Sequence, residues 1–309
     1  MIQQQNLDRY KDNEAEFEKE NCKVGKNYAK YCGDHYEIFN RTNMKDYYEH
    51  VQVIGQDSFI NAWFIDPLIK RYDDFGVYPN SALCPKNVFN LWTPFICELK
   101  TDEFTYDQSA VDLFLYHIRE NLCNGEEELS DFTLMWIAHL IQYPENKSVM
   151  LALVGPQGQG KGWLVDLLKK MLGDKKVFQT SQPDLHVWGN FNPEMKDAFL
   201  VNVNELDRKQ FKDSMGKIKE LITDPTIAIR PLYCNVFSVT SYHRFLATSN
   251  DLEAMPVKEG DRRFVIVEGK DDVGIRDEDS DEVKNEKATF FKKLTKFPRT
   301  CRVRNIYKY

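Results

Sequence analysis

A glycine-rich stretch in the middle of the chain carries the strongest chemical signal. It reads Gly155-Pro156-Gln157-Gly158-Gln159-Gly160-Lys161-Gly162 and fits the pattern G-x-x-x-x-G-K. Glycines let the backbone wrap around a phosphate group so that several N–H groups point inward, and the lysine side chain reaches the β and γ phosphates. We therefore predict that this stretch binds a nucleotide. The alternative is a glycine-rich turn on the surface.

One position within this stretch departs from the pattern. Gly162 stands where a serine or threonine normally gives its hydroxyl to Mg²⁺. Glycine has no side chain, so the metal ion must take a water molecule at this position or bind more weakly.

A second motif follows about forty residues later. The apolar run 198–203 (AFLVNV) is followed by Asn204 and Glu205. An apolar strand that ends in acidic or amide side chains suits a Mg²⁺ site with a water-activating base. We expect Glu205 to act as the base and Asn204 with Glu205 to lie at the metal. Asn204 stands where aspartate is common, which removes one charge. The alternative is an ordinary strand end with a polar cap.

A third motif is the run 244–250 (RFLATSN), which is another apolar strand with a polar end. It predicts that Asn250 lies beside the γ phosphate and orients the attacking water. Ser-Asn-Asp is also a common turn, so the prediction depends on the order of the motifs along the chain.

A fourth motif is the pair Arg262 and Arg263, which precedes the apolar run 264–267. An arginine that reaches the phosphate of a neighbouring subunit would stabilise the charge of the transition state. The alternative is a pair of surface residues in salt bridges.

The motifs need a framework of alternating strands and helices, and the apolar pattern predicts one. Continuous apolar runs indicate buried strands, and a spacing of three or four residues indicates helices. We expect strands at 149–154, 198–203, 226–230, 244–248 and 264–267, and helices at 107–122, 130–142, 163–172 and 210–222. This alternation predicts an α/β fold with a mostly parallel sheet.

The chain divides into four predicted regions. Residues 1–95 are rich in aromatic side chains and predict a small mixed α+β module, and residues 96–144 predict a helical linker or oligomerisation region. The nucleotide-binding core follows at 145–269. Residues 270–309 predict an acidic solvated loop, up to residue 286, and then a basic C-terminal segment.

Composition limits the classes of protein that fit. Hydrophobic residues make up 42% of the 309 residues, no apolar run is long enough to cross a membrane, and the start is too polar for a signal peptide. The net charge of −7 argues against a protein that coats DNA, but a ring motor needs positive charge only along its channel.

Seven cysteines without any CxxC motif indicate free thiols in a reducing, intracellular compartment rather than a secreted protein. Cys22, Cys32 and His35 have a spacing that is loosely typical of zinc ligands. Because no fourth ligand stands nearby, the sequence does not lead us to expect a structural zinc.

The four motifs in this order resemble those of the superfamily 3 helicases, the AAA+ motors of small DNA viruses, poxviruses, phages and plasmids. The likeness is greatest to the poxvirus and phage primase-helicase group, because 89–92 (FNLW) and 136–144 (WIAHLIQYP) resemble the segments that precede the P-loop in that group. The resemblance covers residues 35–268 and predicts an AAA+ P-loop core.

The resemblance also implies a DNA-contacting hairpin between Glu205 and Asn250. It would begin at Ala228 and continue to His243, with Arg230, Tyr233 and His243 as the DNA-binding candidates. Leu232 stands where family members often carry lysine. Arginine pairs with phosphate and tyrosine stacks on a base. The alternative is a strand pair that packs on the sheet.

Family membership would further imply ATP and Mg²⁺ as cofactors, and a homo-oligomeric ring, usually a hexamer, on single-stranded or forked DNA. Lys161, Glu205 and Asn250 would act in one subunit, and Arg262 or Arg263 would act on the ATP of the next. A primase or polymerase is an implied partner. A nucleotide-binding assembly or loader protein with little hydrolysis is the main alternative, and a kinase-like enzyme acting on a small molecule is a third.

Overall fold

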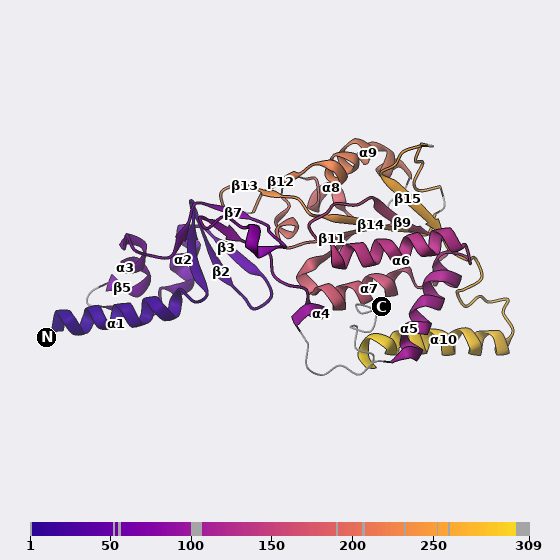
Figure 1. Ribbon diagram of the computed structural model, residues 1–309, viewed down its shortest axis with the longest axis horizontal. Helices are drawn as coiled ribbons and strands as arrows, with labels where there is room; N and C mark the ends of the chain where they lie inside the picture. The colour runs from indigo at the N-terminus through magenta and orange to yellow at the C-terminus, as the bar shows by residue number, and fades with distance from the viewer. Residues whose placement is uncertain are drawn as a thin grey trace. The chain divides into compact units, whose positions relative to one another are not determined.

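The computed structural model describes residues 2–51, 53–54, 57–99, 107–189, 191–205, 208–231, 233–251, 253–258 and 260–300. Leu232 and the basic residues after Thr300 therefore lie outside the described part of the chain. The chain forms two compact units, each built from separate segments (Figure 1). Unit 1 contains Met1–Thr93, Asn190–Asp197 and Thr226–Ser241, and unit 2 contains Pro94–Gly189, Ala198–Pro225 and Tyr242–Tyr309.

Unit 2 is built on a five-stranded sheet in the order β10-β11-β14-β9-β15. Every neighbouring pair of strands is parallel. The strands are β9 (Met150–Val154), β10 (Val177–Thr180), β11 (Leu200–Asn204), β14 (Arg244–Ser249) and β15 (Phe264–Glu268). Each residue of β9 is buried, as expected for a strand in a sheet with both faces covered. The structure confirms the α/β class and the parallel sheet that the apolar runs predict.

Helices cover both faces of this sheet, and Figure 1 shows α7 on one face and α9 on the other. The helical segments of unit 2 are α4 (Ile96–Leu99), α5 (Gln108–Tyr116), the π-helical turn η2 (His117–Leu122), α6 (Glu127–Gln142), α7 (Lys161–Leu172), η3 (Asp174–Lys176), α8 (Pro183–His186), α9 (Arg208–Thr223) and α10 (Asp281–Thr300). Helix α7 ends at Gly173, whose φ of +119° suits glycine. No helix in the described ranges is both long and apolar enough to span a bilayer.

Helix α10 corrects one prediction from the sequence. An acidic loop was expected up to residue 286, but the helix begins at Asp281. The Ser280 hydroxyl accepts a hydrogen bond from the Val283 backbone at 3.3 Å, which caps the helix. Asp281 and Glu282 lie in the first turn, where negative charge interacts favourably with the helix dipole. The acidic residues that suggested a solvated loop therefore help to start this helix.

The described residues of unit 1 form a small sheet, three α-helices and short 3-10 turns. Its elements are α1 (Ile2–Phe17), β1 (Asn21–Val24), β2 (Asn27–Tyr31), β3 (Tyr36–Phe39), α2 (Arg41–Tyr48), β4 (Val53–Ile54), β5 (Asp57–Ser58), α3 (Phe59–Ile65), β6 (Arg71–Tyr72), β7 (Asp74–Gly76), η1 (Ser81–Leu83), β8 (Val88–Asn90), η4 (Pro193–Lys196), β12 (Thr226–Ile229) and β13 (Phe237–Thr240). The main sheet has the order β3-β2-β1-β6. Its core is aromatic, with Phe17 packed edge-on against Trp63 and Phe59.

The hairpin of β12 and β13 belongs to unit 1, although its sequence lies between two strands of unit 2. The rings of Phe237 on β13 and Phe75 on β7 lie 4.5 Å apart. The Asn192 amide donates to the Ala228 carbonyl at 3.1 Å and accepts from the Arg230 backbone at 2.9 Å. The predicted module 1–95 is therefore completed by two later segments, and the hairpin ends at Thr240 rather than at His243.

Candidate functional site

The glycine-rich loop (residues 155–162) connects the carboxyl end of β9 to the first turn of α7. Two of its glycines are required by the geometry. Gly155 has φ +151° and Gly160 has φ +89°, and a Cβ at Gly160 would lie 2.6 Å from His117 Cε1. An L side chain at Gly160 would therefore be strained and would collide with a neighbour. The loop needs glycine where the sequence pattern requires it.

Lys161 is 8% exposed, and its ammonium group donates to the carbonyl oxygens of Gly155 at 2.5 Å and Pro156 at 2.9 Å. Burial lowers the pKa of its ammonium group. Within the described part of the chain, the backbone N–H groups of residues 157–162 have no hydrogen-bond partner. A buried cation, unpaired backbone donors and a helix N-terminus together favour a multivalent anion, so the loop fits a nucleotide phosphate.

Two side chains outside the predicted set hold the loop in shape. Gln159 is buried and donates to the Lys270 carbonyl at 2.6 Å, which ties the loop to the segment after β15. His117 Nε2 lies 3.3 Å from the Gly160 carbonyl oxygen, and Asn121 contacts its other ring nitrogen at 3.1 Å. Burial lowers the pKa of His117 to about 4, so the ring is neutral. In the sequence His117 is one histidine of a predicted helix, and no spacing links it to the loop.

Asn204 and Glu205 lie at the carboxyl end of β11. Asn204 Oδ1 accepts hydrogen bonds from Asn202 Nδ2 at 2.5 Å and from Thr248 Oγ1 at 3.0 Å. Both lone pairs of that oxygen are therefore used, and the amide N–H₂ remains as a donor. Asn204 suits a phosphate oxygen better than a metal ion in this arrangement, which differs from the role expected from the sequence.

Glu205 has an exposed side chain and a left-handed backbone, with φ +54°. Its backbone N–H donates to the Thr248 carbonyl at 2.8 Å. Left-handed backbone is costly for a glutamate, and such residues cluster at active sites. Glu205 is therefore an exposed carboxylate held at a fixed turn.

Asn250 follows β14 directly and is exposed. Ser249, the residue before it, pairs in register with Val154, the last residue of β9. The Ser249 carbonyl accepts the Gly155 backbone N–H at 3.2 Å, and the Ser249 hydroxyl accepts the backbone N–H of Asp251 at 3.1 Å. These bonds place the start of the glycine-rich loop beside the turn that carries Asn250.

The arginine pair lies at the other end of the sheet. Arg262 and Arg263 precede β15, and the Arg263 carbonyl accepts the backbone N–H of Met150, the first residue of β9. β9 begins at this end of the sheet and leads to the glycine-rich loop at the opposite end. Neither arginine therefore lies at the loop of its own chain. Arg263 pairs with Asp261 at 3.4 Å, whereas Arg262 is exposed.

The predicted DNA-binding residues are divided between the units. Arg230 and Tyr233 belong to the hairpin of unit 1, where Tyr233 is 78% exposed with φ +61°. His243 belongs to unit 2, is 5% exposed, and precedes β14. A buried imidazole is poorly placed to meet a polyanion, so His243 does not join the other two candidates on the hairpin.

Comparisons with known proteins find a family of unknown function and one phage DNA primase-polymerase that are similar to parts of this chain. The model of a family of unknown function, DUF5906, matches residues 153–263, which include the glycine-rich loop and the arginine pair. A DNA primase-polymerase from Nitratiruptor phage NrS-1 is 29% identical over 151 residues. The matched part covers 48% of this chain and only 21% of that relative.

Solved structures of the NrS-1 C-terminal region have a similar fold. An apo structure of the NrS-1 C-terminal region matches with a TM-score of 0.62 and 20% identity, over 92% of this chain and 66% of that chain. A second one, the A form of the apo C-terminal region, gives a TM-score of 0.66 at 19% identity, over 92% of this chain and 64% of that chain. Almost the whole chain therefore has the fold of about two thirds of that region.

Proposed function

We propose that this chain is an ATP-dependent DNA helicase motor with an AAA+ core of the superfamily 3 kind, which acts in the replication of a viral, phage or mobile-element genome. One observation carries the proposal. The loop with Lys161, the turn with Glu205 and the turn with Asn250 follow β9, β11 and β14, and these strands are neighbours in the order β11-β14-β9. In open parallel sheets, ligands bind outside the carboxyl ends of the strands.

Each residue at this edge has a distinct role in ATP hydrolysis. The N–H groups of residues 157–162 and the Lys161 ammonium bind the β and γ phosphates. Glu205 accepts a proton from the attacking water, and Asn250 orients that water. The water oxygen bonds to the γ phosphorus, the bond from this phosphorus to the β–γ bridging oxygen breaks, and ADP and phosphate leave.

Magnesium would lie beside Glu205 and, through a water molecule, near Gly162, where it would neutralise charge on the phosphate oxygens. The amide N–H₂ of Asn204 remains available to a phosphate oxygen, because its carbonyl oxygen is already bonded to Asn202 and Thr248.

A homo-oligomeric ring, which we propose to be hexameric, explains the position of the arginine pair. Arg262 and Arg263 lie where the strands of the sheet begin, whereas the glycine-rich loop lies where β9 ends. The two arginines therefore cannot reach the ATP of their own subunit. They can act on ATP only when a neighbouring subunit presents its loop to them. Arg262 is the better candidate because Arg263 is paired with Asp261.

The hairpin of unit 1 supplies the DNA contacts in this proposal. Arg230 and Tyr233 are exposed near the turn between β12 and β13, and a tyrosine can stack on any base of single-stranded or forked DNA. The likeness to a phage DNA primase-polymerase supports replication as the setting and a primase or polymerase as a partner. The six free cysteines that the structure describes suit a reducing intracellular compartment.

A nucleotide-binding assembly or loader protein remains the second candidate. Two features favour it: Gly162 provides no hydroxyl for Mg²⁺, and the Asn204 oxygen is occupied by two donors. Both features weaken the metal site without changing the phosphate-binding loop.

Steady-state ATP hydrolysis with Mg²⁺, in the presence and absence of single-stranded DNA, separates the two candidates. The Lys161→Ala variant is compared with Lys170→Ala, which removes an exposed lysine from the same helix. We expect turnover that DNA stimulates, its loss in Lys161→Ala, and normal turnover in Lys170→Ala. Tight ATP binding without turnover in the unmodified chain would support the loader instead. Normal turnover in Lys161→Ala would remove the nucleotide site from this loop.

A further inference from the structure

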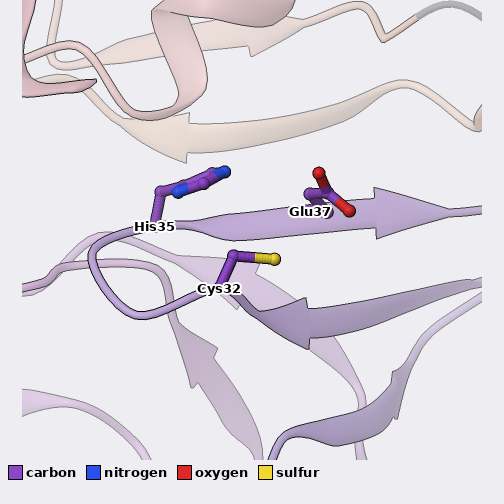
Figure 2. Close-up of side chains that lie close together, drawn as sticks. All are labelled: Cys32, His35 and Glu37. Atoms are coloured by element: carbon purple, nitrogen blue, oxygen red, sulfur yellow. The ribbon is translucent and has the colours of Figure 1, made fainter. Parts of the chain in front are cut away.

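Three side chains in unit 1 form a cluster that the proposed motor does not use. Cys32, His35 and Glu37 lie around the turn between β2 and β3. Their potential ligand atoms (one sulfur, one imidazole nitrogen and one carboxylate oxygen) all lie within 4.8 Å of one another. Figure 2 shows the ring of His35 directed along β3 toward Glu37, with Cys32 beside them.

The local backbone brings these side chains together. The Cys32 N–H donates to the His35 carbonyl at 2.9 Å, which closes the turn and fixes both residues at the end of the hairpin. His35 directly precedes β3, and Glu37 follows two residues later, so both side chains stand on the same face of the strand. The cluster therefore rests on a hydrogen-bonded hairpin.

The neighbours of the cluster favour metal binding by the imidazole. Asp34 Oδ1 lies 2.7 Å from His35 Nδ1, so the ring is oriented by a carboxylate and its other nitrogen is left for a ligand bond. This carboxylate–histidine arrangement is typical of metal sites in proteins. Lys30 Nζ lies 3.8 Å from Cys32 Sγ, where its positive charge opposes a second cation. The same ammonium also lies 5.6 Å from the centre of the Tyr47 ring, which gives it a second partner.

We propose that Cys32, His35 and Glu37 bind one zinc ion, with the fourth position open to water. Thiolate and imidazole ligands select zinc over Mg²⁺ and Ca²⁺. Bond lengths in tetrahedral zinc sites put neighbouring ligand atoms about 3.4–3.6 Å apart, so a cluster whose atoms lie within 4.8 Å of one another needs to contract by at most about 1.4 Å. Three protein ligands with one open position is a known zinc arrangement.

The ligand set differs from the one that the sequence suggests. Cys22 shares the loose spacing with Cys32 and His35, but it is buried on β1, and burial raises the pKa of its thiol to about 12. Its thiol is outside the cluster. Glu37 takes the third place because it shares a strand face with His35, a relation that a search for cysteine and histidine spacing misses.

Zinc titration of the metal-free full chain tests this site. The chain is kept reduced with a phosphine, nucleotide is omitted, and affinity is measured against a chromophoric chelator. We expect one zinc per chain. Cys32→Ser and His35→Ala should weaken binding by at least about 100-fold, and Asp34→Asn by about 10- to 100-fold. Cys84→Ser removes another half-buried thiol of unit 1 and should bind zinc normally. With Co²⁺, a thiolate charge-transfer band should appear and should be absent in Cys32→Ser.

The proposal fails if the unmodified chain binds no zinc at stoichiometric concentration, or if Cys32→Ser and Glu37→Gln bind as tightly as the unmodified chain. Loss of binding in Cys84→Ser would also overturn it. Glu37 is exposed, so Glu37→Gln keeps the fold and separates loss of a ligand from loss of structure. Circular dichroism of each variant identifies any that do not fold.

Discussion

A single added hydroxyl should strengthen the proposed Mg²⁺ site. Gly162 is the second residue of α7 and is exposed to solvent. A Cβ built at this position meets no atom within 4 Å. A serine can therefore enter without strain and offer its hydroxyl where related loops offer theirs. Serine also suits a helix better than glycine, so Gly162→Ser should not destabilise the fold.

The size of the effect follows from one new contact. A hydrogen bond or ligand bond to a charged group contributes about 1.5–3 kcal/mol. At about 1.4 kcal/mol for each factor of ten, this predicts that half-maximal hydrolysis needs roughly 10- to 100-fold less Mg²⁺. Gly162→Ala is the matched control. Alanine stabilises the helix by up to about 1 kcal/mol relative to glycine, but it provides no oxygen for the metal ion.

The assay is steady-state ATP hydrolysis as a function of Mg²⁺ concentration, at saturating ATP and single-stranded DNA. We expect Gly162→Ser to shift the Mg²⁺ dependence to lower concentration, and Gly162→Ala to keep the dependence of the unmodified chain. Equal curves for the serine and alanine variants would refute the reasoning, because position 162 would then not face the metal ion.

Three further predictions address other parts of the molecule. The pKa of His117 is about 4 in the folded chain against 6.5 for the free side chain, so the unfolded state binds the extra proton first as the pH falls. The free energy of unfolding should drop by about 3 kcal/mol between pH 6.5 and pH 4, and urea titrations should show a smaller drop in His117→Gln. The double variant Arg262→Ala, Arg263→Ala should bind ATP normally but lose hydrolysis by at least about 1,000-fold, and mixing it with Lys161→Ala chains should restore part of the turnover if sites are shared between subunits. The double variant Arg230→Ala, Tyr233→Ala should keep basal hydrolysis and lose its stimulation by DNA, which a titration with single-stranded DNA would measure; an unchanged response would move the DNA contact elsewhere.

Four strands of unit 2 were predictable because burial leaves a direct mark on the sequence, whereas β10, in which Phe178 is half-buried and Gln179 exposed, was not predicted. β9 is a continuous apolar run, and β11 is apolar except for the buried Asn202 and for Asn204 at its end; such runs occur where both faces of a strand are covered. The start of α7 was equally clear, because the glycine-rich pattern requires a helix directly after it. Pattern reading missed α10 and predicted a solvated loop at its start, because acidic residues are common both in solvated loops and in first turns of helices.

The contacts between distant segments were not predictable from the sequence. No local pattern shows that His117 supports Gly160, or that the Asn204 oxygen is bonded to Thr248. Both contacts depend on how elements far apart in the chain pack. The same limit applies to the hairpin, because the sequence predicts a strand at 226–230 but does not show the surface against which Phe237 packs.

The division of unit 1 among three segments has a consequence for how the protein is made. The first segment ends at Thr93, but the hairpin that contacts Phe75 is complete only at Ser241. At the usual rates of synthesis, the ribosome needs about 7–30 s to add the intervening residues. During that interval the apolar surface around Phe75 lacks its partner, and a chain cut after Thr93 would never acquire it. The unit that is translated first therefore cannot finish folding until Ser241 has been added, by which point β9, β10 and β11 of the parallel sheet have been synthesised.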